Sequence, residues 1–259
     1  MKIDLHNHTQ RCNHAVGTEE EYVLSAIKSG TKIFGFSDHA PMDFDPKYRM
    51  SFEQMPEYER KIRSLKKEFK SQITILLGYE VDYLPGHMDR RVLEADVDYL
   101  IGSVHFLDKW GFDNPEFIKE YEEKDIDEVW KTYFEAVSQM AQSGLFDIVG
   151  HIDLIKVFKF LPTKNIMEYA EPALQKIKEA DMTIEINTAG YRKPCAEPYP
   201  SKQILSRAYE LGIDITFGSD AHVPQQVGLY TQEAESLAKE AGYEECVYFE
   251  NRQKKRTVF

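Results

Sequence analysis

The 259-residue sequence predicts an α/β fold in which one parallel sheet closes, or nearly closes, into a barrel. Seven short apolar runs have the length and composition of buried strands, and helix-period segments separate most of them. This alternation is typical of parallel sheets, because parallel strands need a crossover connection. No Gly/Ser/Pro-rich linker interrupts the pattern. We therefore expect a single barrel domain over residues 1–259.

The expected strands are short runs that are rich in apolar and β-branched residues. They are Lys2–Leu5, Lys32–Ser37, Ile73–Tyr79, Tyr99–Val104, Phe146–Gly150, Thr183–Asn187 and Asp214–Gly218.

The expected helices are amphipathic. Thr18 and Glu21 have the spacing of a capping box, which predicts a helix that starts there and ends at Gly30. The apolar residues of the segments from Met55 to Phe69 and from Ile126 to Met140 recur at alternating intervals of three and four. Further helices are expected over Asn165–Ala180, Ser201–Leu211 and Thr231–Ala241.

Histidines gather at the ends of the strand-like runs. His6 and His8 are two residues apart after the first run, so on a strand they share one face with Asp4. A barrel carries its chemistry at the carboxyl ends of its strands. A lone histidine is most often structural, but all except His87 of the eight histidines follow this placement. The candidate ligands are His6, His8, His14, His39, His105, His151 and His222.

Two carboxylates, Glu80 and Asp220, complete a candidate set of nine metal ligands. A single zinc ion takes about three protein ligands in a catalytic site and four in a structural one, so nine suit two or three ions. Glu80 is the natural bridge, because it is a carboxylate among imidazoles. Paired metal ions suit displacement at phosphorus. Zinc, manganese and iron all accept such ligands, so the identity of the metal stays open.

Composition and missing motifs exclude several other functions. The net charge of −12 argues against nucleic-acid binding, and the basic run from Arg252 to Arg256 is interpreted as a solvated tail. No apolar run is long enough for a membrane span, and the N-terminus lacks the features of a signal peptide. The three cysteines, which form no Cys-x-x-Cys pair, predict a cytoplasmic protein. Phosphate-loop, dinucleotide-binding and nucleophile-elbow motifs are missing, which leaves metal-assisted hydrolysis.

Four connections are longer than a barrel needs, and each follows an expected strand end. They are Ala40–Phe52, Leu107–Pro115, Ile152–Lys164 and Ala189–Pro200. All four should lie on the face that carries the metals, where loops select the substrate. Arg192 and Lys156 lie in these loops and are the candidate phosphate-binding residues.

The successive motifs resemble those of the polymerase and histidinol phosphatase (PHP) superfamily. These motifs are His6-x-His8, Ser37-Asp38-His39, Glu80, Ser103-Val104-His105, Gly150-His151 and Gly218-Ser219-Asp220-Ala221-His222. The segments Ile186–Lys193 and His151–Lys156 are similar to those of the stand-alone histidinol-phosphate phosphatases of histidine biosynthesis. The resemblance implies a distorted (β/α)7 barrel with three divalent metal ions.

The resemblance also implies a division of the ligands and a mechanism. His6, His8, Glu80 and Asp220 would hold the first ion, and Glu80 would bridge to a second ion on His105 and His151. His14, His39 and His222 would hold the third. A metal-bridging hydroxide would attack the phosphorus, Asp220 or a metal-bound water would protonate the leaving alkoxide, and Arg192 would bind the phosphate. Related phosphatases tend to carry Arg where this chain has Lys156.

Alternatives to a histidinol-phosphatase remain at this point. The chain fits a superfamily member of other specificity, either a broad phosphomonoesterase or a nuclease. It also fits a silent metal-binding module, although such relics usually drop ligands and this chain drops none. The substrate is expected to be a small phosphate monoester, and the oligomeric state stays open.

Overall fold

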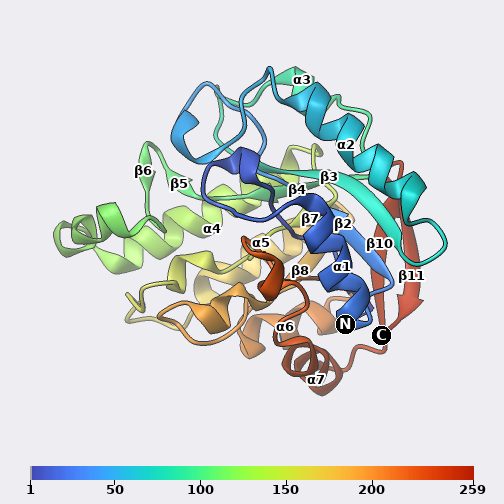
Figure 1. The fold of residues 1–259 in the computed structure, drawn as a ribbon. Helices are drawn as coiled ribbons and strands as arrows, with labels where there is room; N and C mark the ends of the chain where they lie inside the picture. The colour runs from blue at the N-terminus through green and yellow to red at the C-terminus, as the bar shows by residue number, and fades with distance from the viewer. Residues whose placement is uncertain (1) are drawn as a thin grey trace.

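Seven parallel strands form one sheet at the centre of the computed structural model, which describes residues 2–259 (Figure 1). Along the sheet the order is β1, β2, β3, β4, β7, β8 and β9, so each strand pairs with the sheet strand that follows it in the sequence. The bounds are Ile3–Asp4 for β1, Ile33–Phe36 for β2, Thr74–Asp82 for β3, Tyr99–Ser103 for β4, Ile148–Val149 for β7, Thr183–Asn187 for β8 and Ile215–Gly218 for β9. Each lies on a predicted run, so all seven predicted strands are confirmed.

Backbone hydrogen bonds join the two ends of this sheet. The amide of Leu5 donates to the carbonyl of Phe217 at 2.9 Å, and the amide of Asp220 donates to the carbonyl of His6 at 2.8 Å. The amide of His8 continues the seam to Ala221 at 3.0 Å. The predicted barrel is therefore confirmed, and its first strand lies beside its last.

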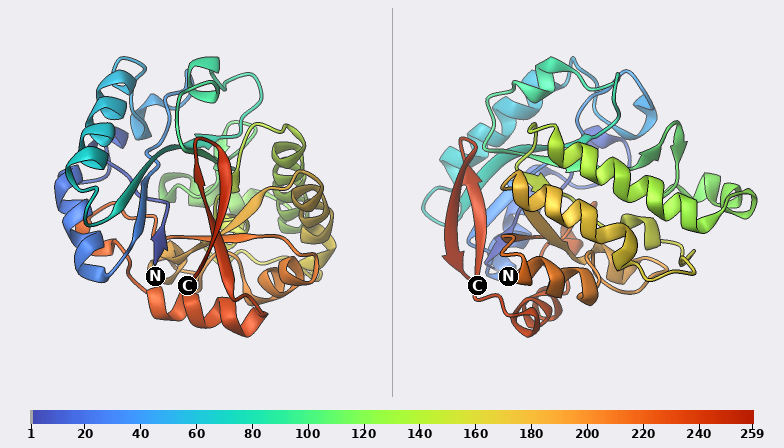
Figure 2. Two further views of the ribbon diagram at one scale, coloured as in Figure 1. Left: turned by 90° about the vertical axis from the view of Figure 1, so that its right-hand side faces the viewer. Right: turned by 180° about the vertical axis from the view of Figure 1, so that it is seen from behind.

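Helices cover the outside of the barrel, and the views from two sides show α4 and α5 packed side by side (Figure 2). The bounds are Glu19–Ser29 for α1, Met55–Glu68 for α2, Arg90–Leu93 for α3, Ile126–Gln142 for α4, Met167–Glu179 for α5, Lys202–Glu210 for α6 and Thr231–Ala241 for α7. The capping box of Thr18 and Glu21 is present, and α1 ends at Gly30, whose φ is 85°. No helix among residues 2–259 has the length and apolar character to cross a bilayer.

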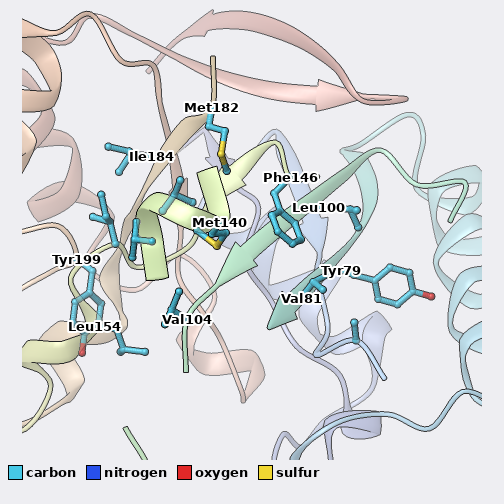
Figure 3. Packing of buried hydrophobic residues seen from close by; sticks show 14 of the residues in the cluster. Tyr79, Val81, Leu100, Val104, Met140, Phe146, Leu154, Met182, Ile184 and Tyr199 are labelled. Carbon is cyan, nitrogen blue, oxygen red and sulfur yellow. The ribbon is translucent and has the colours of Figure 1, made fainter. Parts of the chain in front are cut away.

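Two apolar clusters hold these layers together. The larger one lies between the strands and the helices, where Leu100, Met140 and Phe146 point toward one another (Figure 3). The smaller one combines residues of six barrel strands, among them Ile3, Tyr99 and Phe217, with Leu5 and with residues of α7 and β10. Across this cluster, the Tyr99 hydroxyl donates to the carbonyl of Leu5 at 2.5 Å and so links β4 to the end of β1.

A hairpin of β10 (Glu245–Glu250) and β11 (Gln253–Val258) corrects one prediction from the sequence. The basic run from Arg252 to Arg256 lies largely in β11 and is not a solvated tail. Lys254 and Arg256 both pair with Asp214, at 3.2 Å and 2.7 Å. The run was misread because its cations neutralise carboxylates that are distant in sequence.

Each of the four long connections contains a short helix or part of a hairpin. Ala40–Phe52 holds the 3-10 helix η2 (Pro46–Tyr48), and Leu107–Pro115 holds the turn of a hairpin of β5 (Phe106–Leu107) and β6 (Trp110–Gly111). The other two hold η4 (Leu154–Lys156) and η5 (Thr188–Arg192). Figure 1 shows β5–β6 and β10–β11 on opposite sides of the barrel.

Candidate metal centre

The structure brings together all nine predicted metal ligands at the carboxyl end of the barrel. His6 and His8 follow β1, Glu80 lies within β3, and the remaining ligands follow β2, β4, β7, β9 and the 3-10 helix η1 (Gln10–Cys12). Neighbouring imidazole rings are close, with centroids 5.1 Å apart for His6 and His8 and 4.1 Å apart for His8 and His222. Parallel strands thus deliver residues that are more than two hundred positions apart in sequence to one place.

Glu80 lies at the middle of the set, and its two carboxylate oxygens face different histidines. Oε1 is 2.9 Å from Nε2 of His151 and 3.6 Å from Nε2 of His105. Oε2 is 3.3 Å from Nε2 of His6 and 3.0 Å from Nδ1 of His39. A carboxylate arranged in this way has the geometry of a bridge between two metal positions.

The potential ligand atoms fall into groups that lie within 4.8 Å of one another. Three of these groups share members with the division implied by the family resemblance: His6, His8 and Glu80; Glu80, His105 and His151; His14, His39 and His222. A fourth group joins Cys12 to His8 and His222, but the Cys12 thiol donates to the carbonyl of Thr9 at 3.1 Å.

Asp220 lies between the first and third of these groups. Its Oδ1 is 3.1 Å from Nε2 of His8 and 3.5 Å from Nδ1 of His222. Asp220 and His151 both have positive φ angles, of 51° and 22°. Non-glycine residues rarely adopt this conformation, and such strain is concentrated at functional sites.

The donor atoms fit divalent metal ions. Nε2 of His6, Nδ1 of His151 and Oε2 of Glu80 are buried and lack a hydrogen-bond partner. Nε2 of His14 and Nε2 of His222 face each other at 3.0 Å. Buried polar atoms are normally satisfied, and imidazole nitrogens converging with carboxylate oxygens are a typical donor set for zinc, manganese or iron.

Carboxylates behind the histidines fix the orientation of their rings. Nδ1 of His6 is 2.8 Å from Glu185 Oε1, and Nδ1 of His105 is 2.7 Å from Asp82 Oδ1. Nδ1 of His8 is 3.4 Å from Asp38 Oδ1. With Nδ1 engaged in this way, Nε2 of each ring is left to face the centre.

Sequence reasoning missed Glu185 and the role of Asp82. Glu185 is a fully buried carboxylate in β8, and besides His6 it accepts a hydrogen bond from the amide of His151 at 3.0 Å. A charged residue inside an apolar strand was the available signal. Asp82 stands two residues after Glu80, on the same face of β3.

The charges of the cluster shift the pKa values of its members in opposite directions. Burial raises the pKa of Glu80, but the surrounding histidines, His6 first among them, hold it well below its usual range. Burial lowers the pKa of His105, but Asp82 and Glu80 raise it to about 10. Burial lowers the pKa of His39 to about 4. Glu80 is thus held ionised among imidazoles, and so is Asp220, whose pKa is raised by burial but held well below its usual range by His6 and the other nearby histidines. Metal binding requires ionised carboxylates.

A cavity of about 710 Å³ opens above the cluster and includes Glu80, His105, His151 and Asp220 in its lining. Arg192 also lines it. Nη2 of Arg192 donates to the carbonyls of Ser219 at 2.8 Å and Asp220 at 3.1 Å, whereas Nη1 is buried without a partner. Two backbone carbonyls thus fix the Arg192 guanidinium in the lining of the cavity.

Lys156, the second residue predicted to bind phosphate, is placed elsewhere. Its side chain is buried, donates to the carbonyl of Pro198 at 2.7 Å and pairs with Asp153 at 2.9 Å. It does not line the cavity. Lys156 does lie in one of the loops at this end of the barrel, as predicted. Its ammonium group points toward the buried Asp153, so Lys156 connects two loops instead of facing the cavity.

Comparisons with known proteins agree with this site. The model of the PHP domain family matches residues 4–189, and the PHP-associated family matches residues 200–243. A protein of Deinococcus radiodurans named “Probable histidinol-phosphatase” is 41% identical over 92% of this chain and 93% of its own length. A “Histidinol-phosphatase” of Bacillus subtilis is 32% identical over 90% of this chain and 98% of its own length.

A solved structure has the same fold. The histidinol phosphate phosphatase of Lactococcus lactis, complexed with zinc, L-histidinol and phosphate, superimposes with a TM-score of 0.81 at 24% identity and with 98% of each chain covered. The barrel, the cluster of candidate ligands and the similarity over nearly the whole length all point to the same family. The chain therefore belongs to the PHP domain family, in the group whose curated members are named histidinol-phosphatases.

Proposed function

We propose that this protein is a metal-dependent phosphomonoesterase that hydrolyses L-histidinol phosphate to L-histidinol and phosphate. The observation that carries the proposal is the position of Glu80, whose two oxygens face two groups of histidines at the floor of a cavity that Arg192 also lines. The substrate is suggested by the curated relatives at 41% and 32% identity, which are named for this activity.

The proposed cofactors are three divalent ions, held by His6, His8, Glu80 and Asp220, by Glu80, His105 and His151, and by His14, His39 and His222. The clustering of their donor atoms supports this division. Such ions, when bound, supply a hydroxide for attack on phosphorus and neutralise the charge on the phosphoryl oxygens.

The other steps are assigned to side chains. Arg192 is proposed to bind the phosphate through its guanidinium group. Two backbone carbonyls fix Nη2, and Nη1 has no hydrogen-bond partner. Asp220 lines the cavity, and although burial raises its pKa, the neighbouring histidines, His6 first among them, hold that pKa well below its usual range. Asp220 is therefore proposed to accept a proton from the attacking water and to pass it to the leaving alkoxide. Glu80 stays ionised between the two groups of imidazoles.

We also propose a cytoplasmic location and a place in histidine biosynthesis. Cys12, Cys195 and Cys246 are all free, which is usual in a reducing compartment. A single domain over residues 1–259 is proposed as well. It is supported by β9, which falls in the part matched by the PHP-associated model and yet hydrogen-bonds to β1 and β8 of the PHP part.

The test is phosphate release from L-histidinol phosphate, an aryl phosphate, a sugar phosphate and a single-stranded oligonucleotide by protein loaded with zinc or manganese. We expect strong preference for L-histidinol phosphate and loss of turnover in Glu80→Gln, which keeps the size of the side chain and removes its charge. Equal turnover of the other monoesters would indicate a broad phosphomonoesterase, and hydrolysis of the oligonucleotide a nuclease. Full metal occupancy without any turnover would indicate a silent module.

A further inference from the structure

One carboxylate of the cavity has no assigned role. The acidic residues that line the cavity are Asp45, Glu80, Asp82, Asp113 and Asp220. Asp45 and Asp82 pair with Arg49, at 3.7 Å and 2.6 Å, and Glu80 and Asp220 lie among the histidines. No Lys, Arg or His nitrogen within residues 2–259 comes within 4 Å of the Asp113 carboxylate.

The residues on both sides of Asp113 are anchored. It follows β6, and the preceding Phe112 is fully buried against the ring of Tyr133, at a centroid distance of 5.4 Å. On the other side the Asn114 side chain accepts the amide of Glu116 at 2.9 Å and starts the 3-10 helix η3 (Pro115–Glu123). A carboxylate that is anchored on both sides loses little entropy when it binds a partner.

The surroundings of Asp113 place it beside the metal cluster. Burial raises the pKa of Asp113, and the charges of His105, His151 and Lys193 lower it, so these three groups are near enough to interact with it. His105 does not need Asp113 for its orientation, because its Nδ1 is already engaged by Asp82 and its Nε2 faces Glu80. We therefore look for the partner of Asp113 in the substrate that occupies the cavity.

Aromatic rings form the part of the cavity near the β5–β6 hairpin. Phe44 and Phe106 meet edge to face at a centroid distance of 5.1 Å, and Phe117 continues this wall. Arg192 and Lys193 lie in and directly after η5, on a different loop. The cavity thus combines cations for a phosphate, a lone carboxylate and an apolar wall for a flat ring.

We propose that Asp113 is a specificity-determining residue that binds the ammonium group of the substrate. This inference depends on the proposed function, because L-histidinol phosphate carries its ammonium on the carbon next to the ester methylene. With the phosphate at the metal cluster, the ammonium stays close to the cluster, where Asp113 lies, and the imidazole extends to Phe44 and Phe106. The ion pair compensates the cost of a partly buried, unpaired carboxylate.

The test compares L-histidinol phosphate with its des-amino analogue, in which a hydrogen atom replaces the ammonium group. In the Asp113→Asn variant we expect kcat/KM for L-histidinol phosphate to fall about tenfold to a hundredfold, as for loss of a charge-assisted hydrogen bond. For the des-amino analogue it should stay within about twofold of the wild-type value. Asp108→Asn, an exposed change in the turn of the same hairpin, is the matched control and should leave both substrates unaffected.

A second measurement needs no variant. In the wild-type enzyme, L-histidinol should inhibit at a concentration about tenfold or more below that of the des-amino alcohol. Equal inhibition by the two alcohols would overturn the proposal. So would an equal loss of kcat/KM on both phosphates in Asp113→Asn, which would mean that Asp113 acts on the metal cluster. Failure of the proposed function is recognised separately, because the wild-type enzyme would then not prefer L-histidinol phosphate to the aryl and sugar phosphates.

Discussion

At the scale of single residues, the site depends on side chains that hold other side chains. Arg192 is fixed by two backbone carbonyls, His6 by Glu185 and His105 by Asp82. The nine ligands are visible in the sequence because most of them follow the end of a strand, where local pattern fixes direction. Glu185, Asp82 and the free carboxylate of Asp113 are harder to predict, because their roles depend on which strands become neighbours.

Arg192→Ala should lower kcat/KM for the phosphate ester about tenfold to a hundredfold, because a charged hydrogen bond to the phosphate is lost. Arg192→Lys should recover only part of this, since an ammonium cannot keep both the carbonyl contacts of Nη2 and the free Nη1. Steady-state kinetics on both variants measure the effect. An unchanged kcat and KM in Arg192→Ala would remove Arg192 from the phosphate site.

Lys156→Met should lower stability and leave substrate affinity nearly unchanged. The variant leaves the buried Asp153 without its cation, which typically costs about 3–5 kcal/mol of unfolding free energy. The double variant Asp153→Asn with Lys156→Met should regain part of that loss. Denaturant unfolding and KM are the two readouts, and a large rise in KM in a well-folded single variant would argue for a direct phosphate contact.

Gly218→Ala should weaken metal binding. A Cβ at this position would overlap Oε1 of Glu185 and come within 2.6 Å of Cβ of His6, so the carboxylate could no longer support the ring. Loss of such a supporting contact typically lowers metal affinity about tenfold to a hundredfold. Metal content after dialysis measures this, and Glu185→Gln should give a change in the same direction. Full metal retention in both variants would contradict the role of Glu185.

At the scale of elements, the sequence predicts the barrel well and its outer parts less well. The predicted run Phe146–Gly150 contains a strand of only two residues, Ile148–Val149, because most of this run serves as connection. The hairpin of β10 and β11 was missed because cations dominate β11 and their partners are remote. In contrast, helices α1, α2 and α4 follow from spacing and capping, which are local properties.

The contact between the start of α4 and the segment before α5 should depend on pH. Hydrogen bonds from Thr163 and Tyr169 lower the pKa of Asp127 to about 2 from its usual value of 3.8. Since the folded state binds the proton less tightly, the stabilisation is complete above pH 3.8 and is lost as the pH falls through 2. Asp127→Asn should therefore lower Tm at pH 7 by more than at pH 3. An equal difference at both values would contradict this shift.

At the scale of the whole molecule, every strand of the barrel except β8 supplies or leads to a ligand, and β8 supplies the supporting Glu185. Bound ions therefore join all parts of the sheet. Such ligand sets stabilise the folded state in proportion to the logarithm of the metal concentration over its Kd. The ligands alone let the sequence predict this dependence on metal. Whether the sheet closes fully or only nearly could be decided only from the structure, where the amides of Leu5 and His8 bond to the last strand and the loop after it.

Removal of the ions should abolish turnover and lower Tm together. Chelation leaves imidazoles and carboxylates crowded without their cation, while the apolar clusters persist, so we expect a folded protein of reduced stability. Circular dichroism, thermal melts and phosphate release before and after chelation provide the measurement, with restored Tm and turnover on adding zinc or manganese as the control. Phosphate release that survives complete chelation would contradict a metal mechanism.

The seam between β1 and β9 has a consequence for folding kinetics. Its hydrogen bonds join positions near 5 to positions near 220, so they are among the most non-local contacts of the chain. Contacts of this kind form late, because the entropy of closing a long loop opposes them. The proposed first metal position would take His6 from one side of the seam and Asp220 from the other, and Nε2 of His6 lies 4.0 Å from Oδ1 of Asp220. Ions bound across the seam would have to leave before it could open, so hydrogen exchange of the Leu5 and Asp220 amides should become slower when metal is added.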